Sequence, residues 1–323
     1  MLGSAPATAF VLGAGLGTRL RPLTDSLPKP LVPIFNKPLL TFAFDHLIAS
    51  GVERFVVNTH HRPEAYARIL GEKNGRAEYR GRPVFFTHEP VLLETGGGIK
   101  NAQELIGDSD FISYNGDVLA AFPLAPLVDA HAGSGNIATL ALRSSGAERR
   151  VQFDSASGRI TDLRGIIGGR NEPAYLFTGV AVFSPEIFRH IESGAVVSVI
   201  PVLAELVRMG APVGGVVVDS GSWFDIGNPQ AYLDVHRSIA AGGVAFDYLE
   251  PNGLSRVSPD AEVAGSAKLG GCSCIGSGAQ IEAGAALHDS VVWAGAKVRE
   301  GTMLENAVVS PDWIFQVGAK EMP

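Results

Sequence analysis

Beyond about Gly243, apolar residues recur every six positions, a spacing that neither an α-helix nor a single flat strand produces. The positions are Val257, Val263, Leu269, Ile275, Ile281 and Leu287, followed after a slip of one residue by Val292, Val298 and Leu304. A period of six is typical of a parallel β-helix, in which each flat side of a triangular coil buries one residue per repeat. We therefore expect residues 252–323 to form a short left-handed parallel β-helix of about three coils.

The preceding part of the chain alternates short apolar runs with helical patterns. The expected strands are Ala9–Leu12, Phe55–Asn58, Val84–Thr87, Phe111–Tyr114, Ile137–Leu142 and Gly179–Phe183, and the expected helices are Pro38–Ser50, Pro63–Leu70, Gly97–Leu105 and Leu124–His131. Strands that alternate with helices predict crossover connections and a parallel sheet, and fully apolar strands fit a sheet covered on both faces. Residues 1–245 are thus predicted to be an α/β domain with a doubly wound, mostly parallel, Rossmann-like sheet, joined to the second domain near Gly242–Pro251.

Composition narrows the classes of function. The 323-residue chain has a formal net charge of −7, which argues against a nucleic-acid or membrane-surface binder, because both need a basic field. Its two cysteines, Cys272 and Cys274, cannot build a disulfide framework. No apolar run is long enough to span a membrane, and Met1–Thr8 does not resemble a signal peptide, so we expect a cytoplasmic protein.

The stretch Gly13–Pro33 follows the first expected strand and has the features of a phosphate site. Glycines let a backbone approach phosphate oxygens and point N–H groups at them. The spacing is neither the dinucleotide fingerprint nor a P-loop, since Thr18 occupies the last fingerprint position and no Gly-Lys-Ser/Thr follows. Arg19 follows the loop directly, and the prolines around Lys29 predict an extended, stiff chain that holds this lysine in place.

Five motifs in order resemble the sugar-1-phosphate nucleotidyltransferases, also called sugar-nucleotide pyrophosphorylases. They are GLGTRLRPLT…PKPLVP within Gly15–Pro33, LETGGG at Leu93–Gly98, NGD at Asn115–Asp117, FTG at Phe177–Gly179 and WFDIG at Trp223–Gly227. The resemblance implies the family's activity, in which a nucleoside triphosphate and a sugar 1-phosphate form a nucleotide sugar and pyrophosphate. Both substrates are anions, so the protein must position them and neutralise their charge.

The resemblance also implies roles for individual residues. Arg19 and Lys29 are the expected catalytic cations, and Asp117 and Asp225 are the expected ligands of Mg²⁺. The expected nucleotide contacts are Gly13, Ala14, Gly15, Gly17, Thr18, Glu94, Gly96, Gly97 and Asn115, and the expected sugar contacts are Thr178 and Gly179. Backbone groups of Gly13–Gly15 and of a loop at Glu94–Gly98 should meet the base and ribose, and all charged groups should converge on one triphosphate pocket.

The sequence motifs are compatible with more than one base and more than one sugar. The family's Glu-Lys-Pro segment, which often contacts the sugar, is missing where the chain reads Thr161-Asp162-Leu163-Arg164-Gly165. The catalytic motifs are most similar to N-acetylmuramate-1-phosphate uridylyltransferases, which favours UTP and N-acetylmuramate 1-phosphate. A C-terminal β-helix instead resembles mannose-1-phosphate guanylyltransferases and glucose-1-phosphate nucleotidyltransferases.

The tail has several candidate roles. It is expected to be an oligomerisation module that makes a homo-oligomer, a regulatory module or a cover for the catalytic domain, with Trp293, Trp313 and Phe315 as contact residues. Acyl transfer is disfavoured because His288 is the tail's one histidine. A non-catalytic regulatory subunit is the alternative from a different class, but such a subunit would be expected to have lost the four charged residues.

Overall fold

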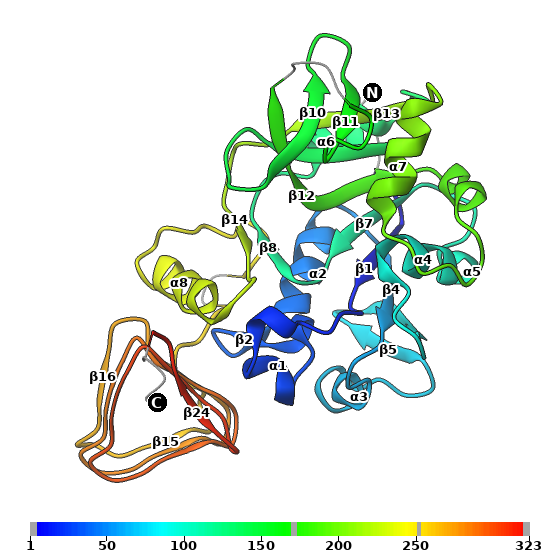
Figure 1. Ribbon diagram of the computed structural model, residues 1–323. Helices are drawn as coiled ribbons and strands as arrows, with labels where there is room; N and C mark the ends of the chain where they lie inside the picture. Colours follow the sequence, from blue (N-terminus) through cyan, green and yellow to red (C-terminus); the bar gives the residue numbers. More distant parts are fainter. Residues whose placement is uncertain (1–4, 169–172, 251–252, 319–323) are drawn as a thin grey trace, which may run out of the picture. The chain divides into compact units, whose positions relative to one another are not determined.

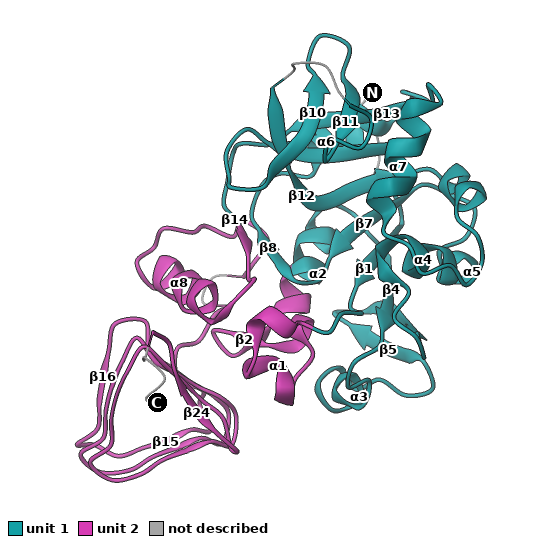
Figure 2. Cartoon of the chain, in the orientation of Figure 1, with its two compact units in different colours: residues 1–16, 43–223 teal, residues 17–42, 224–323 magenta. Residues whose placement is uncertain are grey.

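The computed structural model describes residues 5–168, 173–250 and 253–318. The chain forms two compact units, which Figure 2 distinguishes by colour. Unit 1 comprises residues 1–16 and 43–223, and unit 2 comprises residues 17–42 and 224–323. These units cut across the predicted domains 1–245 and 252–323, because residues 17–42 group with the C-terminal part. Pro251, at the end of the predicted linker, and the predicted domain start at residue 252 lie outside the described residues.

Unit 1 is built on one mixed sheet. Among the described residues its strand order is β10 (Arg149–Asp154), β11 (Arg159–Leu163), β13 (Val213–Val217), β9 (Ala138–Arg143), β12 (Ala174–Phe183), β7 (Phe111–Asn115), β1 (Thr8–Leu12), β4 (Arg54–Thr59), β6 (Arg82–His88) and β5 (Arg76–Tyr79). All six predicted strands are present in it. The short strand β8 (Val118–Ala120) follows β7 and lies outside this sheet.

The sheet is parallel in two separate groups of strands and antiparallel elsewhere, so the prediction of a mostly parallel sheet is only partly correct. Strands β7, β1, β4 and β6 pair in parallel, as do β9 and β13. Strand β12 is antiparallel to both of its neighbours β7 and β9, and β5, β10 and β11 are also antiparallel. For β5 and β6 the reason is the short connection: Arg80 and Gly81 alone join them, both with positive φ, and such a hairpin leaves no room for a crossover helix.

Helices cover both faces of the sheet, as the apolar strands predicted. The helices of unit 1 are α3 (Glu64–Leu70), α4 (Glu94–Asn101), α5 (Gln103–Ile106), α6 (Ala125–His131), α7 (Val199–Arg208) and the 3₁₀ helix η3 (Pro185–His190), while α2 (Leu39–Ala49) spans the boundary of the two units. Phe10 and Val56 point to one face and share a buried cluster with Ile99 of α4. On the other face Phe55 stacks on Phe44 of α2, with ring centroids 4.3 Å apart. The core therefore lies in two apolar layers around β1 and β4 (Figure 1).

Three predicted boundaries need correction. Pro38 belongs to a short strand, so α2 begins at Leu39. The helix expected at Gly97–Leu105 begins earlier, at Glu94, and is interrupted at Ala102. Strand β12 is longer than expected, and its pairing with β9 shifts register between Phe177 and Ala181.

Unit 2 begins with short elements and ends in stacked strands. Its first elements are η1 (Thr18–Leu20), α1 (Leu23–Ser26), η2 (Lys29–Leu31), β2 (Pro33–Ile34) and β3 (Lys37–Pro38). After residues 43–223 of unit 1, the chain returns to unit 2 with β14 (Trp223–Asp225) and α8 (Pro229–Ala240); the first residue of β14 still belongs to unit 1. Asn228 caps α8, since its side-chain oxygen accepts from the Ala231 N–H at 2.9 Å.

The C-terminal residues form three short parallel sheets, which trace the sides of a triangle in Figure 1. They are β15 (Glu262–Val263), β18 (Gln280–Ile281) and β21 (Lys297–Val298); β16 (Lys268–Gly270), β19 (Ala286–His288) and β22 (Met303–Glu305); and β17 (Cys274–Ile275), β20 (Val291–Val292) and β23 (Ala307–Val309), with β24 (Ile314–Gln316) antiparallel to β23. The predicted apolar positions are cross-strand partners, for example Val263 with Ile281 and Ile281 with Val298. We call residues 253–318 the coils.

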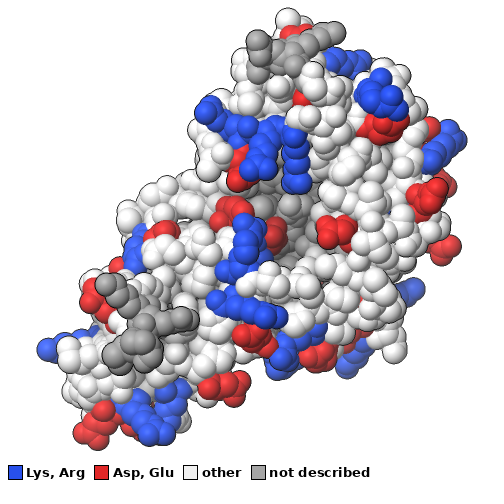
Figure 3. Space-filling model, viewed as in Figure 1, with Lys and Arg blue, Asp and Glu red and all other residues white. Residues whose placement is uncertain are grey.

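The surface carries charges of both signs. On the face shown in Figure 3, Lys and Arg side chains are interspersed with Asp and Glu, in keeping with the net charge of −7. Within the described ranges, no helix is long and apolar enough to cross a membrane.

Candidate active site

The glycine loop after β1 is packed against the end of β4. The Gly13 N–H donates to Asn58 Oδ1 at 2.8 Å, and the Ala14 N–H donates to the same oxygen at 3.3 Å. The Tyr66 hydroxyl, whose pKa is raised by burial, donates to the Gly13 carbonyl oxygen at 3.0 Å. A Cβ on Gly13 would lie 2.5 Å from the Asn58 carbonyl oxygen. The first two loop amides are therefore bonded inside the protein, whereas Gly15 faces open space.

Asn58 is bonded in turn to a fully buried glutamate. Its Nδ2 donates to Glu89 Oε1 at 2.7 Å, and the Leu93 N–H donates to Glu89 Oε2 at 3.0 Å. Asn58 is 1% exposed and Glu89 0%, so both depend on these partners. The pair links the loop after β1 to the start of α4, the two segments expected to contact the nucleotide. Neither residue was predicted. The sequence feature that could have identified them is a pair of polar residues at neighbouring parallel strands, one near the carboxyl end of its strand and one just beyond it.

The segment Glu94–Gly98 is not a loop, contrary to the prediction. It is the first part of α4, and its glycines are buried. The Gly96 and Gly97 N–H groups both donate to the Val197 carbonyl oxygen, at 2.8 and 3.0 Å. A Cβ on Gly97 would collide with the carbonyl oxygen of Ala195. These glycines thus admit a neighbouring backbone, and their contact with the nucleotide stays a prediction.

The turn between β7 and β8 carries Asn115 and Asp117. The Gly116 N–H donates to the Leu12 carbonyl oxygen at 3.0 Å, which fixes the turn at the carboxyl end of β1. Ligands of open α/β sheets bind at this edge. Gly179 has a φ of +81°, and a Cβ there would lie 2.6 Å from Asn115 Nδ2. The structure therefore brings together Asn115, an expected nucleotide contact, and Gly179, an expected sugar contact.

Thr178 does not fit its predicted role as a sugar contact. The residue is 0% exposed, and its hydroxyl donates to the Ala141 carbonyl oxygen at 2.9 Å. Its own carbonyl oxygen accepts from Trp223 Nε1, also at 2.9 Å. Thr178 therefore holds the irregular part of β12 in place and leaves no side-chain atom free for a sugar.

Three of the predicted charged residues meet within unit 2. Lys29 Nζ lies 3.4 Å from Asp225 Oδ1, with 9% of the lysine side chain and 43% of the aspartate side chain exposed. Arg19 Nη1 and Asp225 Oδ2 lie 3.7 and 3.5 Å from the point where a Cβ on Gly227 would stand. The structure thus pairs Lys29 with Asp225 and places Arg19 and Asp225 on either side of the same glycine, while their convergence on one triphosphate pocket stays a prediction. Asp117 belongs to unit 1, and its meeting with them stays a prediction.

The chain is extended at Leu27 and Pro28, as predicted, but Lys29 itself begins a turn. Residues Lys29–Leu31 form a 3₁₀ turn, in which the Leu31 N–H donates to the Pro28 carbonyl oxygen at 2.8 Å. Gly17, with a φ of +59°, lets the lysine stem pass: a Cβ there would lie 3.3 Å from Lys29 Cβ. Thr18, a predicted nucleotide contact, is exposed and begins η1 directly after this glycine.

Arg143 was not among the predicted site residues, but its side chain fixes the segment directly before the WFDIG motif. Its guanidinium donates to the carbonyl oxygens of Val218, Asp219, Ser220 and Gly221 at 3.0 to 3.4 Å. An arginine fork suits several carbonyl oxygens at once, so one side chain fixes a stretch that has no ladder of its own.

The carboxylates suit a hard cation. Among the described residues, no three His, Cys, Asp or Glu side chains lie close enough to share a metal ion. Magnesium does not need such a cluster, because it binds through one or two carboxylates and takes its other ligands from water and phosphate. Asp225 offers one such carboxylate within unit 2, and the participation of Asp117 in the same metal site stays a prediction.

Comparison with known proteins gives the family. A family model described as "Nucleotidyl transferase" matches residues 8–242. The chain belongs to this nucleotidyl transferase family. A mannose-1-phosphate guanylyltransferase of Mycobacterium tuberculosis is 30% identical over 92% of this chain and 82% of its own length. An N-acetylmuramate alpha-1-phosphate uridylyltransferase of Caulobacter vibrioides is 32% identical over 74% of this chain and 99% of its own length.

Further relatives agree on the activity. A UTP–glucose-1-phosphate uridylyltransferase of Synechocystis is 27% identical over 93% of this chain and 86% of its own length. An inositol-1-phosphate CTP transferase structure from T. maritima matches with a TM-score of 0.59 at 22% identity, over 76% of this chain and 100% of that chain, which supports the fold alone. The nucleotidyl transferase described here is a sugar-1-phosphate nucleotidyltransferase, as its motifs indicated.

Proposed function

We propose that this nucleotidyltransferase transfers uridylate from UTP to N-acetylmuramate 1-phosphate, giving the UDP-sugar and pyrophosphate. The assignment of transfer rests chiefly on one observation, the meeting of Lys29, Asp225 and Arg19 within unit 2. The choice of substrates is supported by the catalytic motifs, by the missing Glu-Lys-Pro segment and by the Caulobacter relative, which is matched over 99% of its length.

The reaction requires two anions to approach each other. A phosphate oxygen of the sugar attacks the α-phosphorus in line, the new P–O bond forms, and the bond to the β-phosphate oxygen breaks with its electron pair on pyrophosphate. Lys29, a largely buried cation, would neutralise the α-phosphate or the attacking phosphate. Arg19, which is exposed, would hold the β- and γ-phosphates and stabilise the leaving pyrophosphate.

Asp117 and Asp225 would hold Mg²⁺, which supplies Lewis-acid stabilisation of charge on the phosphate oxygens when it is bound. Asp225 also pairs with Lys29, so the same carboxylate orients the catalytic lysine. Replacing Asp225 would therefore disturb both the lysine and the metal.

The nucleotide is proposed to contact the loop at Ala14, Gly15, Gly17 and Thr18, the start of α4 at Glu94, Gly96 and Gly97, and the side chain of Asn115. Gly13, whose N–H and carbonyl oxygen are both bonded within the protein, would support this loop. Gly179, beside Asn115, is proposed to contact the sugar. Asn58 and Glu89 would act behind these contacts, because they fix the glycine loop relative to α4.

Transfer of guanylate to mannose 1-phosphate is the second candidate. It is favoured by the Mycobacterium relative, whose match extends over 92% of this chain. The Synechocystis relative brings glucose 1-phosphate into the same comparison.

We also propose the domain limits 1–245 for the catalytic part and 252–323 for a left-handed parallel β-helix. The stacked register of the coils supports this helix. A homo-oligomer through the coils is part of the same proposal.

A substrate grid tests the assignment. Each of UTP, GTP, CTP, dTTP and ATP is paired with N-acetylmuramate, mannose and glucose 1-phosphates, and pyrophosphate release is measured with magnesium. The proposal expects the highest kcat/KM with UTP and N-acetylmuramate 1-phosphate. A higher value with GTP and mannose 1-phosphate establishes the second candidate, and inactivity with every pair favours a non-catalytic subunit.

A further inference from the structure

The segment that carries Arg19 and Lys29 is bound to the coils at two points that flank the lysine. Upstream of Lys29, the Trp313 indole Nε1–H donates to Ser26 Oγ at 2.9 Å. Downstream, Asn36 Nδ2 donates to the carbonyl oxygens of Ser255 and Ile275, at 3.1 and 2.8 Å. All of these residues belong to unit 2, and the stretch between Ser26 and Asn36 contains the whole 3₁₀ turn of Lys29.

The downstream anchor sits in a turn that the chain does not favour on its own. Phe35 and Asn36 join β2 to β3 as a two-residue hairpin, and both have positive φ, +47° and +64°. Asn adopts this conformation readily, but a bulky aromatic residue does so only where its surroundings hold it. Phe35 is held by α8: its ring stacks on His236 with centroids 5.2 Å apart, and its N–H donates to His236 Nε2 at 3.3 Å.

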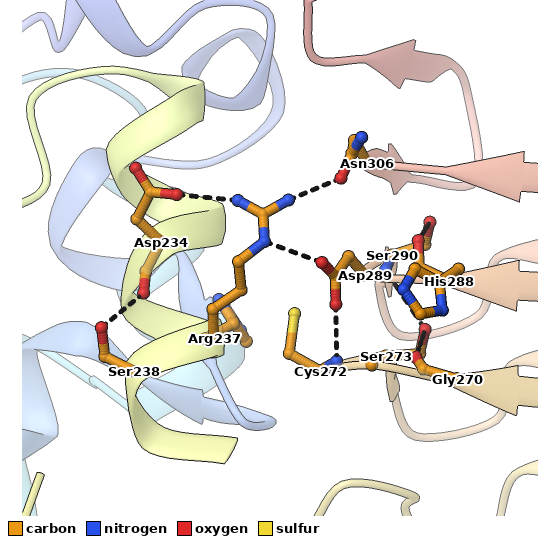
Figure 4. A network of polar contacts seen from close by, with 12 residues as sticks. Asp234, Arg237, Ser238, Gly270, Cys272, Ser273, His288, Asp289, Ser290 and Asn306 are labelled. Carbon is orange, nitrogen blue, oxygen red and sulfur yellow. Dashed lines mark hydrogen bonds and ion pairs between the residues drawn. The ribbon is translucent and has the colours of Figure 1, made fainter. Parts of the chain in front are cut away.

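Helix α8 is itself fixed to the coils. Figure 4 shows the Arg237 guanidinium reaching from α8 to Asp289 and Asn306 of the coils, with Nε 2.8 Å from Asp289 Oδ2 and Nη2 2.5 Å from Asn306 Oδ1. Asp289 also accepts from the Cys272 N–H at 2.8 Å. Burial, together with the negative charge of Asp289, raises the pKa of the Cys272 thiol to about 12, so the thiol stays neutral beside the ion pair.

A second connection runs through buried aromatic residues. Trp293 of the coils, 5% exposed, donates from Nε1 to the Tyr232 hydroxyl at 3.2 Å. The Tyr232 hydroxyl donates to the Pro33 carbonyl oxygen at 2.7 Å. Trp293 also packs against Trp313, with ring centroids 5.3 Å apart. The coils therefore reach the segment both directly and through α8.

We propose that the coils are a positioning scaffold for the segment Gly17–Phe42, with Asn36 and Trp313 as positioning residues for Lys29 during nucleotidyl transfer. The inference rests on the proposed role of Lys29. It assigns the tail a function in catalysis by this same chain, separate from oligomerisation. It also agrees with the division of the chain: residues 17–42 belong to the same compact unit as the C-terminal residues, although the residues before and after them in sequence belong to unit 1.

The test uses full-length variants and the best substrate pair of the grid. Trp313→Phe and Ser26→Ala remove the two ends of one hydrogen bond, and Asn36→Gly removes the second anchor without a penalty for positive φ. Each is expected to lower kcat three- to tenfold at 25 °C, with the KM of the sugar phosphate within twofold and the fold intact by circular dichroism. The double variant at Trp313 and Ser26 should be no slower than either single one. Val298→Ala, in the coil interior, is the control: it should lower the Tm and leave kcat within twofold.

Dependence on Lys29 separates positioning from general stability. In a Lys29→Ala background, at enzyme concentrations that make the residual turnover measurable, Asn36→Gly should change turnover less than twofold. An equal loss in both backgrounds overturns the inference, as does unchanged kcat in Asn36→Gly and Trp313→Phe when the wild-type chain is active. Inactivity of the wild-type chain with every substrate pair would instead overturn the proposed function, and this inference with it, so the two failures are distinguishable.

Discussion

Removing the charge of Lys29 is the most direct test of the mechanism, and its magnitude follows from the ion pair. Two unit charges 3.4 Å apart, the distance from Lys29 Nζ to Asp225 Oδ1, interact by about 5 kcal/mol at an effective dielectric constant of about 20. Asp225 is 43% exposed, so solvent screening reduces this to about 2–3 kcal/mol. A phosphate oxygen at a similar distance in the transition state would gain a comparable amount. Lys29→Met should therefore lower kcat by about 10²-fold.

The assay is steady-state pyrophosphate release with the best substrate pair, accompanied by thermal unfolding. Because Asp225 is partly exposed, water can solvate its carboxylate in the variant, and we expect Tm to fall by less than about 3 °C. Lys37→Met is the matched control. It removes the same charge from the same segment, where Lys37 lies over the Phe42 ring at 5.5 Å, and should leave kcat within twofold. A folded Lys29→Met enzyme with near wild-type kcat would refute the role of the lysine.

Three further predictions concern residues behind the site. Gly97→Ala should destabilise the fold by about 1–3 kcal/mol in urea unfolding, because the new methyl group meets the Ala195 carbonyl oxygen; an unchanged midpoint would contradict this packing. Asn58→Ala leaves a buried glutamate without one donor, and we expect a loss of about 1–3 kcal/mol together with a raised KM for the nucleotide, whereas an unchanged KM would remove Asn58 from nucleotide positioning. Burial lowers the pKa of His46 and of His236 to about 4, so the unfolded chain binds more protons than the folded chain between pH 6.5 and 4. The free energy of unfolding should therefore decrease as the pH is lowered, by about 2 kcal/mol per histidine at pH 5. Equal urea midpoints at pH 7 and pH 5 would count against this prediction.

Most of the fold could be predicted from the spacing of the apolar residues. A period of six predicted which coil residues stack, including the one-residue slip, because each side of the coil has room for only one inward residue per repeat: Leu269, Leu287 and Leu304 form one column. The direction of a strand leaves no such pattern. Strand β12 is as apolar as its neighbours, so its antiparallel pairing with β7 and β9 could not be read from composition.

The meeting of charged side chains in the candidate site was predictable from the motifs. Lys29, Arg19 and Asp225 were found from their charge and their motifs, although 196 positions separate the lysine from the aspartate. Asn58 and Glu89 were missed because a buried polar pair is recognisable only once its partners are known: without the loop after β1, Asn58 is one polar residue at the end of an apolar strand.

The motif glycines show that the structural role of a signature residue can differ from the role expected from its sequence. The backbone of Gly13 was expected to meet the base and ribose, yet its N–H is bonded to Asn58, and the absent side chain makes room for the β4 backbone. Gly97 and Gly179 repeat the pattern, since one admits the Ala195 carbonyl oxygen and the other the Asn115 amide. Each glycine brings its segment against the residue that fixes it, so we expect it to act on the proposed ligand through the geometry of its neighbours. Substitutions at these glycines should therefore alter stability and nucleotide affinity together, whereas substitutions of Lys29 should alter turnover alone.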